Sequence, residues 1–390
     1  MGTLTTRLKV LHIHTRAVIG GSGANTLFTM DGLDKNRFEP ILACGPQGGA
    51  LLDEAGKMNL RTEVIPHLAN QINFFKDILA FFELKRLIKR ERFDIVHTHN
   101  SKAGILGRLA ARCCRVPIII HTVHSCVFLY SNLSAFQRKL FYCVEKFAAP
   151  FADKYIAISR PLQDEFIKAH IAPAEKFVTI YSGIDLAQFK KGLDVSAKKR
   201  DFGIAQDEFV VGTVTRLAPG KGVEVFLRAA ARAIADVPNV RFLIVGEGPL
   251  KDRLIQLAQE LNISQKCIFT GLRQDVERIT TIFDVSVLAS FYEGMGRVVL
   301  ESQAEGKPVV ASKVGGIPDI VNDGQTGILV SPGDDKAFAA AIIKLLKDAT
   351  LRGQMARAAA EWVGYRFSRE KMVADIVELY EQLIRKKLKI

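Results

Sequence analysis

The chain has 390 residues, 48% of them hydrophobic, and its 54 basic and 41 acidic side chains give a formal net charge of +13. It is too long for one ordinary hydrophobic core and long enough for two. It contains no run of about 18 uninterrupted apolar residues, which excludes an ordinary membrane-spanning helix. The segment from Met1 to Lys9 lacks the apolar stretch of a signal peptide, so we expect a cytoplasmic protein.

Two further classes are disfavoured by composition. A basic balance would suit a nucleic-acid-binding protein, but no recognition motif accompanies it. The cysteines show no spacing typical of a metal knuckle or a disulfide framework, which predicts reduced thiols. They are Cys44, Cys113, Cys114, Cys126, Cys143 and Cys267.

Short apolar runs alternate with stretches of helical period, which is the pattern of parallel α/β layers. In the first half the expected strands are Leu8 to His14, Ile41 to Cys44, Asp94 to His97, Ile118 to Thr122, Tyr155 to Ile158 and Val178 to Tyr181. In the second half they are Phe209 to Val214, Phe242 to Val245, Cys267 to Phe269, Val285 to Leu288, Val309 to Ala311 and Ile328 to Val330.

The segment from Asp185 to Asp201 is poor in apolar residues and carries Lys190, Lys191, Lys198, Lys199 and Arg200. Such composition predicts an exposed segment between domains. We therefore predict an N-terminal domain of residues 1–185, joined by a terminal helix at 368–390, and a C-terminal domain of residues 186–367.

After the first strand, the stretch from Ile19 to Asn25 predicts a flexible glycine loop before a helix from Thr26 to Leu33. The loop contains Gly20, Gly21 and Ser22. It is not a dinucleotide fingerprint, because the third glycine is missing and no acidic residue follows the second strand. This argues against a dehydrogenase and leaves an ordinary tight turn as the alternative.

The stretch from Phe74 to Phe93 predicts an amphipathic helix with phenylalanines before a basic end. Such a helix can lie on an anionic membrane surface. A helix that packs on the first sheet with a solvated basic face explains the pattern equally well.

Histidines gather in the first half at His97, His99, His121 and His124. Their spacing suggests zinc, but no carboxylate or cysteine stands beside them at ligand spacing, which favours ordinary polar positions. Asn100 and Ser101 are expected to cap the next helix.

Arg216 follows the strand that begins the second half, and Lys221 follows five residues later before a helix near Val223. A guanidinium fork and an ammonium group at this position can neutralise a leaving diphosphate. The alternative is a pair of solvated basic residues.

Glu293 and Glu301 flank a glycine-broken turn that opens into an expected helix, between two short strand runs. Strand, glycine loop, helix and strand form a unit that binds ligands at strand carboxyl ends, and unpaired N–H groups at the helix start suit a phosphate. Two solvated glutamates on a surface helix would give the same spacing.

The stretch from Ser290 to Ser312 resembles the signature of family 4 glycosyltransferases, and the match continues through Gly315 to Val321, Asp323 to Gly327 and Pro332 to Asp334. The resemblance covers nearly the whole chain. It implies a GT-B fold, in which two Rossmann-like domains face each other across a cleft and the last helix crosses back to the first domain. From His97 to Arg108 and at His124 the chain looks most like bacterial capsule and exopolysaccharide transferases.

The resemblance also implies residue roles. The expected catalytic residues are His124, Glu293, Arg216 and Lys221. Donor binding is expected from Gly20, Gly21, Ser22, Arg216, Lys221, Leu272, Arg273, Glu293, Gly294, Met295, Gly296, Arg297 and Glu301. His99, Asn100 and Ser101 are expected on the acceptor side. Ser125 and Cys126 stand where the family often has glycine, so the loop around His124 departs from the pattern.

The function implied is hexosyl transfer from a nucleoside diphosphate sugar, UDP-sugars being favoured, to a lipid-linked or glycan acceptor with retention of configuration. No metal or other cofactor is expected, since no Asp-x-Asp pair occurs. The expected location is the cytoplasm or the inner membrane face, where surface polysaccharide or glycolipid is made. The alternatives are a sugar-nucleotide epimerase or hydrolase, and a non-catalytic nucleotide-sugar-binding protein on the same fold.

Overall fold

The computed structural model describes residues 7–129, 133–189 and 194–389, and the chain divides into two compact units. The first unit runs to Gly183 and includes residues from Arg369 onward, whereas the second spans Ile184–Ser368. The chain thus passes between units just before the expected linker. Lys190 and Lys191 of the expected linker lie outside the described residues, as do residues 1–6, which belong to the segment examined above for a signal peptide.

The first unit is built on a seven-stranded parallel sheet of order β3-β2-β1-β4-β5-β6-β7. Its strands are β1 (Leu8–His14), β2 (Phe38–Cys44), β3 (Arg61–Val64), β4 (Ile95–His99), β5 (Ile118–Val123), β6 (Lys154–Ala157) and β7 (Phe177–Thr179). The edge strand β3 is missing from the expected set because its residues Arg61, Thr62, Glu63 and Val64 are mostly polar and none is fully buried.

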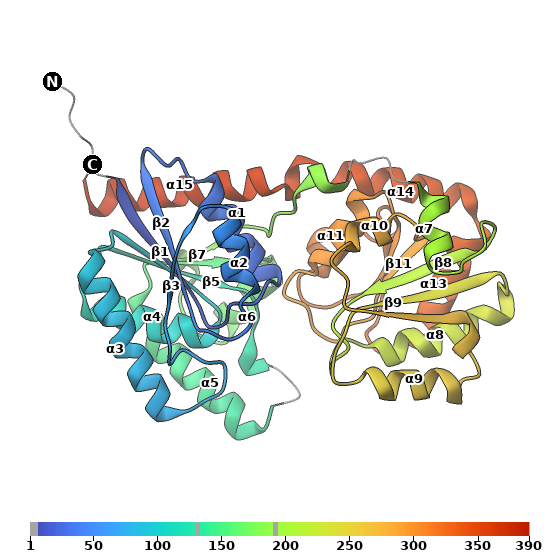
Figure 1. Cartoon of the computed structure of the whole chain (residues 1–390), viewed down its shortest axis with the longest axis horizontal. Helices are drawn as coiled ribbons and strands as arrows, with labels where there is room; N and C mark the ends of the chain where they lie inside the picture. Colours follow the sequence, from blue (N-terminus) through green and yellow to red (C-terminus); the bar gives the residue numbers. More distant parts are fainter. Residues whose placement is uncertain (1–6, 130–132, 190–193, 390) are drawn as a thin grey trace. The chain divides into compact units, whose positions relative to one another are not determined.

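Helices cover both faces of this sheet, with α3, α4 and α5 on one side and α15 on the other (Figure 1). The helices of the unit are α1 (Gly21–Gly32), α2 (Ala50–Lys57), α3 (Phe74–Glu91), α4 (Ser101–Cys113), α5 (Ala135–Ala148), α6 (Arg160–Lys168) and α15 (Arg369–Lys387). The terminal helix α15 packs against α1 and buries Ile376, Tyr380 and Ile384 among residues of β1, β4 and β5. This confirms that the last helix belongs to the first domain.

Strand alternation determines which residues the two helical layers cover. In β1, Leu11 and Ile13 pack toward α3 and α4, whereas Leu8 and Val10 pack toward α15. Successive side chains of a strand point to opposite faces, so His12 and His14 continue the α15 face. The parallel register sets His12 opposite His97 on β4.

The second unit has a six-stranded parallel sheet of order β10-β9-β8-β11-β12-β13. Its strands are β8 (Phe209–Val214), β9 (Val240–Val245), β10 (Cys267–Gly271), β11 (Val285–Leu288), β12 (Val309–Ser312) and β13 (Gly327–Val330). This order matches that of the classical dinucleotide-binding sheet, so the expectation of two Rossmann-like sheets is confirmed.

The helices of this unit also lie on both faces, with α8 and α9 on one side and α7, α10 and α11 on the other (Figure 1). They are α7 (Val195–Asp201), α8 (Val223–Asp236), α9 (Lys251–Glu260), α10 (Val276–Thr280), α11 (Arg297–Ala304), α12 (Ile317–Ile320), α13 (Asp335–Lys347) and α14 (Ala349–Val363).

Two local expectations are wrong. The glycine stretch after β1 is helical from Gly21. The first turn of α1 packs closely on the preceding loop, since a Cβ at Gly23 would lie only 2.8 Å from Val18 O. Most described residues of the expected linker are exposed or half-buried, but the segment belongs to the second unit and contains α7. Lys199 of α7 is 8% exposed and donates its ammonium to the carbonyls of Gln206 and Glu208. Hydrogen bonds to these backbone carbonyls offset the desolvation free energy of burying that ammonium group.

Candidate functional site

The second unit brings together polar side chains at the carboxyl ends of β8 and β11. These neighbouring strands mark the point where the strand order reverses, which is where open α/β sheets bind ligands. Lys221 follows β8 and Glu293 follows β11, and Lys221 Nζ lies 2.7 Å from Glu293 Oε1. Ser290 Oγ donates a 2.8 Å hydrogen bond to the same oxygen. An ion pair therefore ties the loop after one strand to the loop after its neighbour.

Glycines let these loops approach one another. A Cβ on Gly222 would lie 1.9 Å from Ala289 O, and one on Gly315 would lie 1.8 Å from Glu293 O. Both residues have positive φ, 65° and 47°, which glycine adopts without strain. The loops after β8, β11 and β12 are consequently packed backbone against backbone.

Gly294, Met295 and Gly296 lead from Glu293 into α11. Gly296, which has no side chain to cap the helix, occupies the N-cap position with φ 81°. Arg297 is the first residue of α11, and its Nε donates a 2.8 Å hydrogen bond to Oε1 of Glu301, one turn further along the helix. The Glu301 side chain is 19% exposed, and its burial raises the pKa of the carboxyl above its usual range, against the opposing effect of Arg297. Met295, by contrast, is 3% exposed and packs inward.

The remaining residues expected on the donor side are less organised. Arg216 is exposed after β8, and Leu272 is 79% exposed after β10. Arg273 makes two hydrogen bonds, of 2.8 and 3.0 Å, to Asp275. These bonds hold the pKa of the Asp275 carboxyl below its usual range, so the Arg273 guanidinium is engaged within its own loop.

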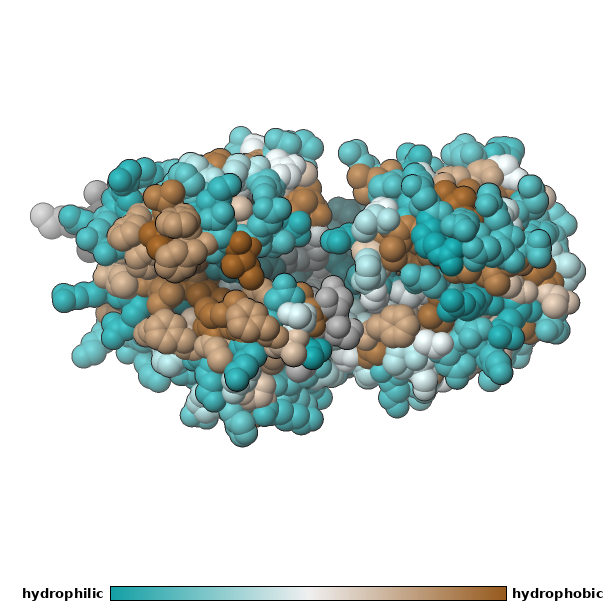
Figure 2. Space-filling model, turned by 90° about the horizontal axis from the view of Figure 1, so that it is seen from below, coloured by the Kyte–Doolittle hydropathy of each residue, from teal (hydrophilic) through white to brown (hydrophobic). Residues whose placement is uncertain are grey.

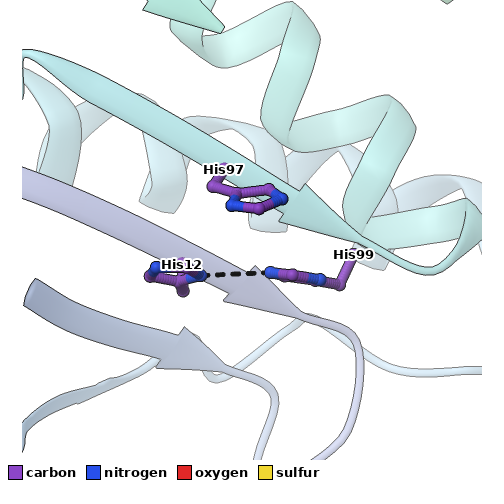
Figure 3. Close-up of side chains that lie close together, drawn as sticks. All are labelled: His12, His97 and His99. Carbon is purple, nitrogen blue, oxygen red and sulfur yellow. Dashed lines mark hydrogen bonds between the residues drawn. The ribbon is translucent and has the colours of Figure 1, made fainter. Parts of the chain in front are cut away.

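In the first unit, histidines gather at the corresponding reversal point, between β1 and β4. His12 and His14 on β1 and His97 and His99 on β4 are each at most 3% exposed. Figure 3 shows three of them, His12, His97 and His99, close together. The sequence interpretation missed His12 and His14, because only strand pairing places them beside the other two. The available signal was the matching His-x-His spacing in both strands.

His99 lies at the centre of this histidine cluster. Its Nε2 is 3.1 Å from His12 Nδ1 and its Nδ1 is 3.2 Å from His124 Nε2. Its ring stacks on those of His14 and His97, with centroid distances of 4.5 Å in both cases. His124, half-buried in the loop after β5, is thereby connected to the core of the unit.

Desolvation keeps the cluster neutral. Burial lowers the pKa of His12 to about 3 and that of His124 to about 4. The pKa values of His14, His97 and His99 also lie well below the ordinary value, again chiefly because of burial. Each ring is therefore an uncharged imidazole near neutral pH, with one N–H donor and one acceptor nitrogen.

Nitrogens of His12, His97 and His99 lie within 4.8 Å of one another, a spacing that a metal ion could span. The lone pairs of an imidazole lie in its plane, however, and the His97 and His99 planes are stacked at 28°. The two nitrogens of His97 lie 2.7 Å from Tyr380 Oη and 2.6 Å from Thr122 Oγ1. The arrangement favours a hydrogen-bonded network over a coordination sphere.

Asn100 corrects one expectation. It occupies the N-cap position of α4, with φ 60°, but its side chain does not cap that helix. Its Nδ2 instead lies 3.2 Å from His14 Nδ1. Asn100 therefore contacts the histidine cluster instead of capping α4, and Ser101 is the first residue of that helix.

The glycine pair after β1 leaves backbone accessible. Gly20 is the N-cap of α1, and Gly21 and Ser22 form its first turn. A Cβ at Gly20 or Gly21 would meet no atom within 4 Å among the described residues. The structure thus places Gly20, Gly21, Ser22 and the histidine cluster in the first unit, and Arg216, Lys221, Glu293 and Glu301 in the second.

Comparison with known proteins follows the same division. Residues 19–188 match the family described as Glycosyltransferase Family 4, and residues 194–362 match the family described as Glycosyl transferases group 1. A UDP-Gal:alpha-D-GlcNAc-diphosphoundecaprenol alpha-1,3-galactosyltransferase of Escherichia coli is 30% identical over 98% of this chain and 99% of its own length. A D-inositol 3-phosphate glycosyltransferase of Mycobacterium marinum is 34% identical over 75% of this chain and 64% of its own length.

Among solved structures, Anabaena HepE in complex with UDP and glucose superposes with a TM-score of 0.85 at 25% identity. The superposition covers 96% of this chain and 100% of HepE. The similarity therefore extends through both units.

The packed loops of the second unit give a first prediction. Gly222→Ala should lower the free energy of unfolding by at least about 2 kcal/mol more than Gly220→Ala, because its Cβ meets a backbone carbonyl. Gly220 is the matched control, since it has φ 86° but open space around a Cβ, and should cost only about 1 kcal/mol. Urea denaturation of both variants measures the difference, and equal losses would contradict the close approach.

Proposed function

Because the chain belongs to glycosyltransferase family 4 and is a GT-B glycosyltransferase, we propose that it transfers a hexose from a UDP-sugar to a lipid-linked acceptor, with retention of configuration. The Escherichia coli relative supports both the donor and the acceptor class, since its name specifies UDP-Gal and a diphosphoundecaprenol-linked sugar and it matches almost the whole chain. UDP and glucose bound to HepE support the same donor.

The observation that carries the proposal is the ion-paired loop cluster at the carboxyl ends of β8 and β11. Lys221 stands within 2.7 Å of Glu293, with the start of α11 in the same loop. A diphosphate bound there would meet an ammonium group and a helix N-terminus, both of which attract anions. Glu293 is then available to accept hydrogen bonds from sugar hydroxyls.

Glu301 and Arg216 are proposed to take the roles that their positions allow. Glu301 accepts from the ribose diol, with Arg297 beside it. Arg216, exposed at the end of β8, supplies a second positive charge to the leaving diphosphate. Because basic side chains and helix termini supply this charge, the reaction is proposed to proceed without a metal ion.

In the first unit, His124 is proposed to face the transferred sugar, and His99, Asn100 and Ser101 to shape the acceptor side. Gly20, Gly21 and Ser22 offer open backbone at the start of α1, suited to donor phosphates. The product would be a surface polysaccharide or glycolipid precursor, such as a capsule or exopolysaccharide repeat.

Three alternative functions can be separated by assay. A hydrolase would release free sugar from UDP-sugar without any acceptor, and an epimerase would interconvert sugar nucleotides. A binding-only protein would bind UDP-sugar and turn nothing over. Incubation with UDP-sugars and a diphosphate-linked polyprenyl acceptor, followed by analysis of lipid and water-soluble products, distinguishes all three from transfer.

Peripheral membrane binding is a further part of the proposal. On α3, Phe74, Phe75 and Phe82 are 73%, 79% and 56% exposed, and on α5, Phe136 and Phe147 are 76% and 63% exposed. Both helices pack beside α4, so they share one side of the sheet. Figure 2 shows apolar residues gathered on this side of the first unit.

Basic side chains border these phenylalanines. Lys76, Arg86 and Lys89 are exposed on α3, and Lys139 and Lys146 are exposed on α5. Aromatic side chains that enter the acyl boundary next to lysines at headgroup level are the pattern of an interfacial helix on anionic lipid. No helix in the described parts of the chain has the length and apolarity needed to cross a bilayer.

The donor site yields a prediction at Glu301. Glu301→Ala should weaken UDP binding about tenfold or more, because the loss of a charged hydrogen-bond acceptor costs about 1.5–3 kcal/mol. Isothermal calorimetry with UDP measures this. Glu305→Ala, at the end of the same helix, is the matched control and should bind UDP like the wild type. Unchanged affinity in Glu301→Ala would remove Glu301 from the site.

The diphosphate role predicts the effects of removing the basic residues. Lys221→Ala and Arg216→Ala should each lower kcat by about a hundredfold or more, as the loss of a transition-state charge contact does. Lys251→Ala is the control, because Lys251 also begins a helix after a neighbouring strand and is paired, to Glu247 at 3.0 Å. Steady-state rates that match the wild type in folded Lys221→Ala protein would refute the assignment.

The membrane surface predicts vesicle binding that depends on exposed phenylalanines. Flotation with vesicles containing phosphatidylglycerol should recover the wild type, and the double variant Phe74→Ser/Phe75→Ser should partition about tenfold less. Tyr365→Ser, which removes a 65%-exposed aromatic from the second unit, should not change binding. Binding of the double variant at the wild-type level, or none by the wild type, argues against this surface.

A further inference from the structure

A chain of hydrogen bonds runs through the histidine cluster and ends at His124. Because each neutral imidazole has one N–H group and one bare nitrogen, fixing the direction of one bond fixes the direction of the next. The tautomer of His124 can therefore be derived from the groups at the start of the chain.

The series of hydrogen bonds starts at Asn100. Its Nδ2 lies 3.2 Å from His14 Nδ1, and an amide nitrogen can only donate, so His14 Nδ1 is the bare nitrogen. The proton of His14 then sits on Nε2, which donates to Thr26 Oγ1 at 2.7 Å.

The hydroxyl of Thr26 determines the direction of the next hydrogen bond, which joins it to His99. Its hydroxyl is fully buried, and within the described residues the acceptor left for its hydrogen is His99 Nε2, 3.3 Å away. His12 Nδ1 approaches the same nitrogen at 3.1 Å (Figure 3). With Nε2 accepting, His99 carries its proton on Nδ1 and donates it to His124 Nε2 at 3.2 Å.

The opposite direction fails at Thr26. A proton on His99 Nε2 would leave the buried Thr26 hydroxyl accepting from His14 with no acceptor for its own hydrogen among the described groups. Buried polar groups are nearly always hydrogen-bonded, so this arrangement is disfavoured.

We propose that Asn100, Thr26 and His99 are positioning residues that hold His124 as the Nδ1–H tautomer. Its Nε2 is occupied by His99, and its Nδ1 has no partner within the described parts of the chain. On this half-buried residue the Nδ1–H group is a hydrogen-bond donor that faces away from the cluster. What it donates to, an oxygen of the sugar or of the diphosphate, rests on the proposed function.

The assignment gives His124 a defined chemical role. A ring whose bare nitrogen is already engaged cannot take a proton from an acceptor hydroxyl, whereas its N–H can stabilise negative charge on oxygen. His124 is thus a donor and not a general base. An imidazole's protonated nitrogen is set by the hydrogen bond that the other nitrogen makes, so the cluster, not the loop, decides this role.

The test is the nitrogen NMR signature of His124 in the ligand-free protein labelled with 15N-histidine. His124→Gln identifies the signal by its loss. The expected spectrum shows a protonated Nδ1 and a bare Nε2, and a protonated Nε2 or a tautomer mixture would overturn the proposal. No donor is present, so this result is independent of whether UDP-sugar is the substrate.

Asn100→Asp tests the path itself. At about pH 8.5, chosen to keep His14 neutral, the new carboxylate can only accept, which moves the His14 proton to Nδ1. Thr26 then donates to His14, His99 donates to Thr26, and His124 must donate through Nε2. The His124 signature should invert in Asn100→Asp and stay unchanged in the control Asn70→Asp, an exposed site. An unchanged signature in folded Asn100→Asp would overturn the chain, and the wild-type spectrum decides the tautomer should that variant not fold.

Discussion

The parallel pairing of β1 with β4 and of β8 with β11 is the constraint on which both candidate sites depend. Parallel strands end at the same edge of a sheet, and where the strand order reverses the connections leave toward opposite faces and open a space between them. In the second unit this register brings Lys221 beside Glu293. In the first it brings His12 and His14 beside His97 and His99. Residues far apart in sequence become neighbours through backbone hydrogen bonds alone.

The two sites use charge in opposite ways. In the second unit, basic side chains are held by partly exposed carboxylates, such as Lys221 by Glu293, with side-chain exposures of 32% and 14%. Ion pairs of this kind contribute only about 0–1 kcal/mol, so exchange of the carboxylate for a phosphate is inexpensive. The carboxylates of Glu293 and Glu301 hold Lys221 and Arg297 in place. A set of cations without such partners would repel one another.

The first unit instead holds uncharged groups in a dry environment. Burial lowers the pKa of His12 to about 3, so the interior retains neutral imidazoles whose hydrogen bonds have direction. A directional network in a low dielectric is rigid, because reversing one bond requires reversing its neighbours. Tyr380 of α15 belongs to this network through His97, which gives the return of the terminal helix a purpose beyond covering apolar surface. The helix that completes the core also supports the polar residues next to the site.

Much of this protein follows from the sequence itself. Buried parallel strands are short apolar runs, so they were located without a structure, as were the loops that carry Lys221, Glu293 and Glu301, because glycine and charge mark them. The strand β3 was not predicted because it is a polar edge strand. The start of α1 at Gly21 was predicted too late in the sequence, because glycine has a low helix propensity that packing has to offset. The partners of Asn100 and His99 come from other strands and helices, and no local pattern encodes them. The sequence by itself determined the elements and the chemistry available at their ends; only the tertiary structure decided which of those groups meet, because strand register and helix packing act between residues that are distant along the chain.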